Sequence, residues 1–409
     1  MKQPLDHCLI RASAGTGKTY QLALRYLRLL AAGVPPEEIL ATTFTRKAAG
    51  EILDRVLLWL AKAVHDPQER QSLAQTLAWP DLDAACCRQM LRSLLDRLHA
   101  LRIGTLDSFF LQIALAFSPE LGLVPGWSIC DELDDAALRD EAIQRLLADQ
   151  RPGDLATLVH ALTKGATRRS VARLVQDTIA DLYDLYCETT PQAWRRWSPP
   201  PAVPEERLQA ALDRLQAFAD DRSRLGSAIQ DDLARWFSQD PEAILSKGLF
   251  KKIAEGETTF HRQEIPPEIV SAYRTLLNEV RRLALVELAW QTEATCELLE
   301  RFETHYKALQ AARGTLRFTD VTACVARVQQ QLDGPQFAFR LDGPIRHLLL
   351  DEFQDTSPLQ WRALRPLARR IVGEARGTFF CVGDGKQAIY GWRGGVAEIL
   401  DALPQELAP

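Results

Sequence analysis

Residues 9–19, with the sequence LIRASAGTGKT, contain side chains that could bind a phosphate group. Lys18 could reach the β- and γ-phosphates of a nucleotide, and the Thr19 hydroxyl could bind Mg²⁺. The spacing is that of a phosphate-binding loop, G-x-x-x-x-G-K-[ST], except that Ala12 stands at the first Gly position. An ordinary Gly-rich turn is the alternative. The candidate cofactor-binding residues of this segment are Ala12, Ser13, Ala14, Gly15, Thr16, Gly17, Lys18 and Thr19.

Two adjacent carboxylates, Asp351 and Glu352, follow the apolar run 345–350. The carboxyl end of a buried strand is where an α/β sheet presents groups to a ligand. Asp351 would hold Mg²⁺, directly or through water, and Glu352 would be the base that deprotonates an attacking water. A capped helix start is the alternative, but Lys18 and Thr19 in the same chain favour the nucleotide site.

The elements around the first loop alternate between strand and helix. A strand is expected over residues 6–10, followed by the loop and a helix that ends near residue 32. A second buried strand is expected over 38–44, and Thr45 can cap a helix over 46–63. This β-α-β-α order predicts a parallel sheet with helices packed on it.

The pattern then changes to helical periodicity, and residues 131–310 contain no convincing buried strand. The Pro-rich segment 198–204 is expected to be stiff and extended, and the prolines at 266–267 precede a long helical stretch. Buried strands return at 345–350 and 378–382. The sequence therefore predicts an α/β domain split by an all-α insert large enough to be a domain itself.

Composition sets the broad class of protein. The chain has 409 residues, 46% hydrophobic and 25% charged, which is typical of a soluble protein with two or three domains. No apolar run is long enough for a membrane span, no secretory signal is recognisable, and the eight cysteines include no C-x-x-C pair. A cytoplasmic protein is expected. Because the net charge is −5, any nucleic-acid site must be a local groove with stacking side chains.

Five segments in a fixed order carry a family resemblance, and they cover the α/β parts of the chain. Together they resemble the first motor domain of the superfamily 1 DNA helicases of the UvrD/Rep type. The first segment is most similar to the RecB and AddA branch, whose members work in end-resecting helicase–nuclease complexes. The segments are 12–19 (ASAGTGKT), 43–49 (TFTRKAA), 104–109 (GTLDSF), 351–356 (DEFQDT) and 382–394 (VGDGKQAIYGWRG).

The resemblance implies a RecA-like P-loop parallel sheet domain that uses ATP and Mg²⁺. Its ATPase domain, 1A, would consist of residues 1–125 and 313–409, and the helical insert domain, 1B, of residues 126–312. Lys18, Glu352 and Gln387 would be catalytic. Gln354 and Gln387 would sense the γ-phosphate through their side-chain amides. Thr19 and Asp351 would hold the metal.

The resemblance also implies residues that bind single-stranded DNA. Phe44, Tyr390 and Trp392 would stack on bases. For Phe44 alone, core packing is favoured, whereas Tyr390 and Trp392 lie in a Gly-flanked loop that favours the DNA role. Thr105 and Ser108 could bind backbone phosphates, with a turn or helix cap as the equal alternative. Arg393 could bind by charge or couple the DNA site to Asp351; Asp320, in a further family-like segment, is a weaker candidate.

Some positions depart from the UvrD-type pattern. Only a few residues precede the loop, so the adenine-reading Gln upstream of it has no counterpart. Asp107 stands where many members have His, and Tyr20 where they have Arg. The chain ends at Pro409, and a second motor domain with its arginine fingers is not expected within it.

These observations predict an ATP-binding, single-stranded-DNA-binding motor domain of a UvrD/RecB-like DNA helicase, truncated before the second motor domain. By itself it would hydrolyse ATP slowly if at all. A helicase–nuclease partner subunit is implied, and no association with a membrane is expected. One alternative is a non-catalytic DNA- or protein-binding module with a vestigial nucleotide site. Another is a small-molecule kinase, which leaves the loop from Tyr390 to Trp392 unexplained.

Overall fold

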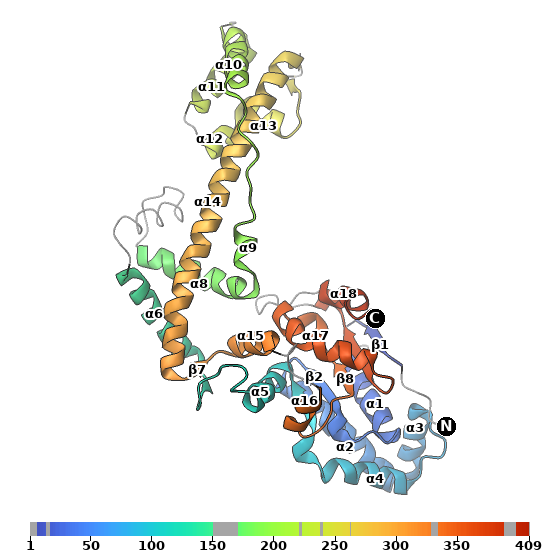
Figure 1. Cartoon of the computed structure of the whole chain (residues 1–409). Helices are drawn as coiled ribbons and strands as arrows, with labels where there is room; N and C mark the ends of the chain where they lie inside the picture. The colour runs from blue at the N-terminus through green and yellow to red at the C-terminus, as the bar shows by residue number, and fades with distance from the viewer. Residues whose placement is uncertain are drawn as a thin grey trace. The chain divides into compact units, whose positions relative to one another are not determined.

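The computed structural model describes most of the chain and divides it into two compact units. The described residues are 6–13, 17–149, 171–220, 223–237, 240–261, 263–328, 334–387 and 398–408. One unit comprises residues 1–136 and 310–409, and the other comprises residues 137–309. Figure 1 labels the elements of both. The second unit begins and ends inside the predicted range 126–312.

A five-stranded sheet forms the centre of the first unit. The strand order is β1-β9-β8-β2-β3, and every neighbouring pair is parallel. The strands predicted at 38–44, 345–350 and 378–382 are present, whereas the first lies slightly later than the predicted 6–10. The bounds are β1 Cys8–Arg11, β2 Ile39–Thr43, β3 Arg102–Thr105, β8 His347–Leu350 and β9 Thr378–Gly383.

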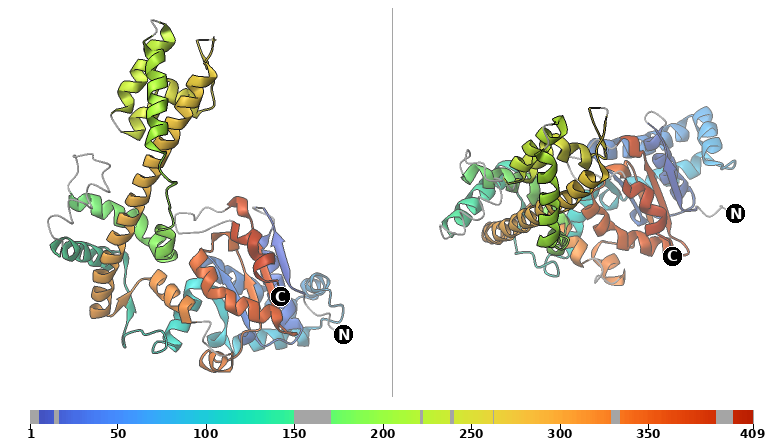
Figure 2. Two further views of the ribbon diagram at one scale, coloured as in Figure 1. Left: turned by 45° about the horizontal axis from the view of Figure 1, so that its top comes forward. Right: turned by 90° about the horizontal axis from the view of Figure 1, so that it is seen from above.

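Helices cover both faces of this sheet, as the views in Figure 2 show. Because successive side chains of a strand point to opposite faces, Leu349 packs with one group of helices and its neighbours Leu348 and Leu350 with the other. The first group is α1 Lys18–Ala31, α2 Arg46–His65, α3 Pro67–Leu77 and α4 Ala84–Leu95. The second is α5 Leu106–Ala116, α15 Phe318–Val328, α16 Gly334–Arg340, α17 Pro358–Gly373 and α18 Glu398–Glu406.

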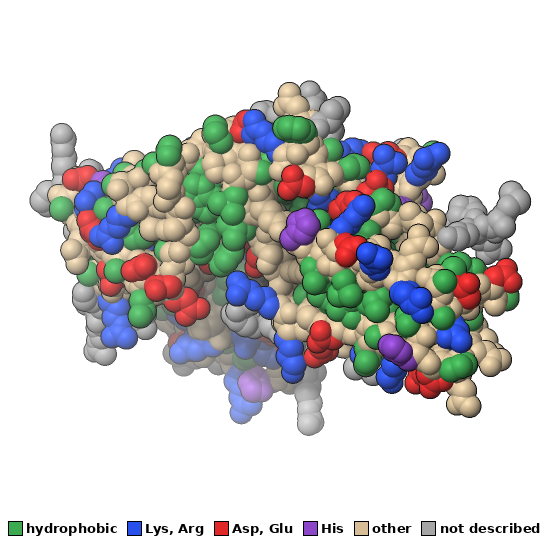
Figure 3. Space-filling model, turned by 90° about the horizontal axis from the view of Figure 1, so that it is seen from below, with side chains coloured by type: hydrophobic (Ala, Val, Ile, Leu, Met, Phe, Trp, Pro, Cys, Tyr) green, Lys and Arg blue, Asp and Glu red, His purple; other side chains and the backbone are tan. Residues whose placement is uncertain are grey.

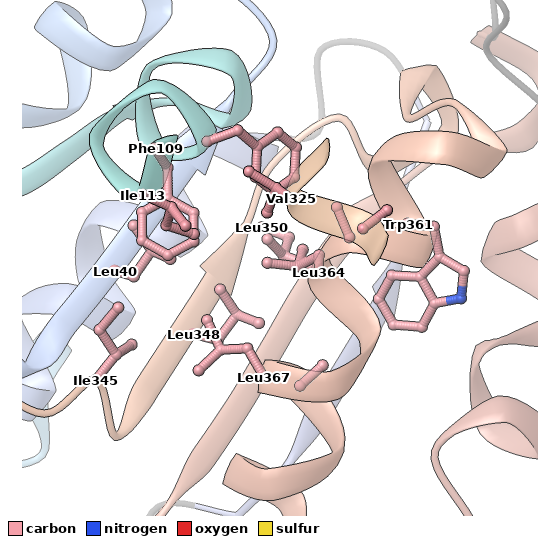
Figure 4. Packing of buried hydrophobic residues seen from close by; sticks show 14 of the residues in the cluster. Leu40, Phe109, Ile113, Val325, Ile345, Leu348, Leu350, Trp361, Leu364 and Leu367 are labelled. Atoms are coloured by element: carbon pink, nitrogen blue, oxygen red, sulfur yellow. The ribbon is translucent and has the colours of Figure 1, made fainter. Parts of the chain in front are cut away.

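The second of these cores is shown in Figure 4. Leu40, Leu348 and Leu350 from the strands meet Ile113 of α5 and Leu364 of α17, and all five are at most 2% exposed. Strands buried on both faces are near-continuous apolar runs, which is why these segments could be recognised in the sequence. This double burial holds the carboxyl ends of the strands in place.

Side-chain caps fix where α2 and α17 begin. Thr45 accepts a hydrogen bond from the Ala48 N–H at 3.1 Å, which confirms the predicted cap of α2. At α17, Ser357 and Gln360 form a reciprocal capping box. Such caps satisfy N–H groups that have no partner inside the helix. Both helices therefore start directly after a strand end or a carboxylate segment.

The described residues of the second unit are helical apart from one hairpin. The 47-residue helix α14, Pro267–Arg313, starts at the predicted proline break and carries two separate apolar clusters along its length. The hairpin pairs β5 Thr259–Phe260 with β6 Gln263–Glu264, which corrects the strictly all-α prediction. His261, with φ +48°, turns the chain there. The other helices of this region are α6 Glu132–Ala148, α8 Val171–Glu188, α9 Pro191–Trp194, α10 Glu205–Ala219, α11 Arg224–Trp236, α12 Pro241–Ser246 and α13 Gly248–Ala254.

The surface mixes charges of both signs. On the face seen in Figure 3, Lys and Arg side chains are interspersed with Asp, Glu and apolar side chains. A net charge of −5 agrees with this mixture. Among the described helices, none is long and apolar enough to cross a membrane.

Candidate nucleotide site and nucleic-acid interface

The amino end of α1 is built to face an anion. Gly17 precedes the helix with φ +81°, a left-handed conformation that favours glycine, and no side chain caps this end. The first turn carries no acidic residue, so its backbone N–H groups and the positive end of the helix dipole remain available. Ala12 continues the β1–β9 pairing by donating to the Gly383 carbonyl at 3.2 Å, and Ser13 follows it. The predicted residues Ala14, Gly15 and Thr16 lie outside the described residues.

The candidate metal ligands lie together beside this helix end. Thr19 Oγ1 donates to Asp351 Oδ2 at 3.1 Å, although the two residues are far apart in the sequence. Asp351 follows β8, and its N–H donates to the Thr42 carbonyl of β2 at 2.9 Å. The sheet therefore aims this carboxylate toward the start of α1.

Asp351 is 5% exposed, and its environment opposes its charge. Burial, with a smaller contribution from the charge of Glu352, raises the pKa of Asp351 to about 6, while the Thr19 hydrogen bond lowers it. A divalent cation would compensate this buried charge, and carboxylate and hydroxyl oxygens are ligands that Mg²⁺ accepts. The pair therefore fits a Mg²⁺ ion. In the described part of the chain, no group of three or more His, Cys, Asp or Glu side chains forms a metal site.

Lys18 and Glu352 form a partly buried ion pair at the same place. Lys18 Nζ lies 2.6 Å from Glu352 Oε2 and also donates to Gln387 Oε1 at 3.3 Å. The Lys18 side chain is 6% exposed and that of Glu352 is 32% exposed. Glu352 has φ +50°, a strained conformation for a residue other than glycine. Phosphate oxygens could replace the carboxylate as partners of Lys18, so this cation fits a nucleotide.

Gln354, which is predicted to sense the γ-phosphate, is bonded on both sides within the protein. It is 1% exposed, its Nε2 donates to Glu352 Oε2 at 2.6 Å, and its Oε1 accepts from the Asp384 N–H at 2.9 Å. Both ends of its amide are therefore bonded within the protein. A direct contact with a γ-phosphate would require these bonds to break, whereas Gln387 already touches Lys18.

The described residues predicted to bind DNA gather near the carboxyl ends of β2 and β3. Phe44 is half-buried after β2. Thr105 accepts from the Ser108 N–H at 3.2 Å, and the two hydroxyls are 2.8 Å apart, so Thr105 caps α5. The other three predicted residues, Tyr390, Trp392 and Arg393, lie outside the described residues.

A hollow of about 320 Å³ opens between α2, β3 and α5. Its lining mixes a cation, hydroxyls and apolar side chains, and Gly50 on α2 leaves open space in place of a side chain. The lining residues used below are Arg46, Gly50, Leu53, Ile103, Thr105 and Ser108.

Two contacts were missed in the sequence. Asp384 links Gln354 to Gln387. Like Asp351, it directly follows a buried strand, and this position in the sequence could have marked it as a site residue. Asp107 accepts from Gln360 Nε2 at 2.8 Å and joins the starts of α5 and α17, which no local pattern indicated. Asp320, the weaker candidate, is bonded to Arg317 and Gln310 in a closed cluster.

Comparison with known proteins decides the family. The sequence profile of the UvrD/REP helicase N-terminal domain matches residues 1–408. The chain belongs to this family. The resemblance carried by the five segments is thereby confirmed.

Curated relatives point to the same branch. The chain is 27% identical to an ATP-dependent helicase/nuclease protein of the AddA type from Levilactobacillus brevis, over 95% of this chain and 34% of the relative. It is 26% identical to the protein of the same name from Streptococcus thermophilus, over 94% of this chain and 34% of the relative. The chain therefore spans about a third of the length of these relatives. It is similar to the RecB/AddA-like proteins within the family.

Proposed function

We propose that this chain is the ATP-binding and single-stranded-DNA-binding motor domain of a UvrD/RecB-like DNA helicase that acts in DNA repair or recombination. The observation that carries the proposal is the meeting of Lys18, Thr19, Asp351 and Glu352 at one edge of the sheet. A vestigial site would not be expected to keep a cation, a hydroxyl and two carboxylates in contact. The RecA-like domain 1A would be the sheet unit, and domain 1B the helical unit.

The chain's own residues would have the following roles in hydrolysis. Bound ATP would supply the phosphoryl group that is transferred to water, and Mg²⁺ would neutralise part of its negative charge. Thr19 and Asp351 would hold the metal. Lys18 would exchange Glu352 for phosphate oxygens, and the released Glu352 carboxylate would accept the proton of the attacking water.

Single-stranded DNA would bind beside this site. Phe44, Tyr390 and Trp392 would stack on bases, a contact of about 1–3 kcal/mol per base. Thr105, Ser108 and Arg393 would contact the backbone. The hollow beside Gly50 offers mixed polar and apolar walls, which suit a base and its sugar.

Turnover by this chain alone is proposed to be slow. Transition-state charge on a transferred phosphoryl group is stabilised by arginine fingers, worth about 10³–10⁵ in rate. In this proposal such arginines come from a second motor domain, and the assembly includes a helicase–nuclease partner, by analogy with the names of the relatives.

The test is Mg²⁺-dependent binding of a fluorescent ATP analogue to the wild-type chain and to Lys18→Ala. Because charge-assisted hydrogen bonds contribute about 1.5–3 kcal/mol, we expect affinity to fall about 10- to 100-fold. Lys62→Ala, which removes an exposed lysine on α2, is the matched control and should bind as the wild type does. Unchanged affinity of Lys18→Ala would favour the non-catalytic binding module instead.

The DNA part has a separate test. Gly50→Leu would fill the hollow, and we expect it to weaken binding of an oligo-dT single strand about tenfold, the equivalent of one stacked base. Gly50→Ala adds only a methyl group and should change affinity less. If the wild type and both variants bind oligo-dT with equal affinity, the hollow is not part of the proposed interface. As a control, all three should bind the ATP analogue with the same affinity.

A further inference from the structure

Gln354 forms a bridge between two strand ends of the sheet. On one side, its Nε2 donates to Glu352 Oε2 at 2.6 Å, just after β8. On the other side, its Oε1 accepts from the Asp384 N–H at 2.9 Å, just after β9. With an exposure of 1%, the amide exchanges these partners with water only if the surrounding residues move.

A glycine at the end of β9 leaves room for the bridge. A Cβ atom added to Gly383 would lie 2.8 Å from Gln354 Oε1 and 3.2 Å from two carbons of Leu400. Contacts this close force one of the atoms to move. Because Leu400 is 2% exposed and packed in the core, the amide of Gln354 would be displaced.

The bridge acts on an oxygen that Lys18 also holds. Glu352 Oε2 accepts from both Lys18 Nζ and Gln354 Nε2, each at 2.6 Å. If Lys18 turns to a phosphate, the bond from Gln354 remains and keeps the carboxylate from rotating freely. The backbone of Glu352, at φ +50°, is in a sparsely populated conformation that needs such support.

We propose that Gln354 is a positioning residue that holds the carboxylate of Glu352 and is itself held by the Asp384 N–H through the space left by Gly383. The proposal rests on the proposed function, because Glu352 must be the base. It replaces the γ-phosphate contact expected for Gln354. The segment that carries Asp384 also carries Gln387, so it contacts Lys18 directly and reaches Glu352 through Gln354.

The first test is single-turnover ATP hydrolysis by the whole chain, in excess over labelled ATP and with oligo-dT present. Gln354→Met keeps the length of the side chain but cannot donate an N–H, and we expect the rate of the bound complex to fall about 10- to 100-fold, a fraction of what a general base contributes. ATP affinity should change much less than the rate. A matching loss of affinity would mean that Gln354 contacts the nucleotide, which overturns the proposal.

A double variant tests whether Gln354 acts through Glu352. Once Glu352→Gln has removed the base, adding Gln354→Met should lower the rate no further. Independent effects that multiply would overturn the proposal.

Gly383→Ala should behave like Gln354→Met, because it pushes the amide out of place. Gly373→Ala is the matched control, since a Cβ there meets nothing within 4 Å, and it should keep the wild-type rate.

Hydrogen exchange of the Asp384 amide gives a readout without turnover. The exchange should be about tenfold faster in Gln354→Met and Gly383→Ala, as expected for the loss of one hydrogen bond. Unchanged exchange would overturn the bridge, whereas failure of the wild type to bind ATP would overturn the proposed function itself.

Discussion

Each unit contains a carboxylate that pairs with a basic side chain: Asp232 in the helical unit and Glu352 in the sheet unit. The two differ in their other hydrogen-bond partners. Asp232 of α11 is completely buried, and its Oδ2 accepts from the N–H groups of Leu249 and Phe250 and from the Tyr273 hydroxyl at 2.8–3.2 Å. Arg235 pairs with its other oxygen. Glu352 is partly exposed, and the side-chain bonds described for it come from Lys18 and Gln354.

The partners explain the difference. Backbone N–H groups of α13 cannot leave Asp232 unless that helix moves, and a Cβ on Gly248 would collide with Asp232 Oδ1, so the cluster is tightly packed. Lys18 is a flexible side chain that can exchange one anion for another. We infer that Asp232 fixes α11, α13 and α14 together, whereas Glu352 is held so that it can be released.

Replacing Glu352 should have the largest effect, and it should appear in turnover. Glu352→Gln removes the proposed base, and a general base typically contributes about 10²–10⁴-fold in rate. Stability should fall less than in the Asp232 variant below, because Glu352 is 32% exposed and the Gln amide oxygen can still accept a hydrogen bond from Lys18. Single-turnover hydrolysis and thermal unfolding measure the two quantities. If Glu352→Gln lost much stability but kept normal turnover, Glu352 would be the structural carboxylate of the two, and the inferred difference from Asp232 would be wrong.

Replacing Asp232 should give the opposite result. Asp232→Ala removes an acceptor that Arg235 and the α13 N–H groups share, and loss of one partner from a buried pair costs about 3–5 kcal/mol. Faster hydrogen exchange in residues 248–254 should report this loss, with ATP affinity unchanged. Asp231→Ala, an exposed neighbour on the same helix, should exchange like the wild type; equal exchange in both variants would contradict the inferred role.

A smaller effect is expected from His347, at the amino end of β8. Burial, with smaller contributions from the charges of Arg25 and Arg346, lowers its pKa from 6.5 to about 4. As the pH falls from 6.5 to 4 the unfolded chain binds the proton first, so stability is lost over this window, by about 3 kcal/mol in total. Below pH 4 this contribution is constant.

Urea unfolding at neutral and mildly acidic pH, on either side of the ordinary histidine pKa, measures the contribution of His347. His347→Gln can keep a hydrogen bond to Thr378, which the wild-type ring makes at 2.8 Å, and should lose less stability between the two pH values. His65→Gln, at an exposed site, should match the wild type. Identical pH dependence in all three chains would show that His347 does not carry this part of the stability.

The sequence by itself determined the sheet and most of the candidate nucleotide site. Apolar runs predicted the strands, the spacing of the first loop pointed to Lys18 and Thr19, and the rule that parallel strands end at the same edge of a sheet pointed to Asp351 and Glu352. That rule depends only on the order of the elements along the chain. Local residue types predicted the other two features: the prolines at 266–267 predicted the start of α14, and the hydroxyl of Thr45 predicted the cap of α2.

The tertiary structure alone decided which partner each polar side chain has. Gln354 is bonded to Glu352 and to the Asp384 N–H, and no residue spacing encodes these two partners. Gly383 matters through a neighbour that is close in space and distant in the chain. Asp232 was not predicted at all, since its partners on α13 and α14 come together only when the helices pack. Local order places the groups at the sheet edge, whereas packing selects the bonds between them.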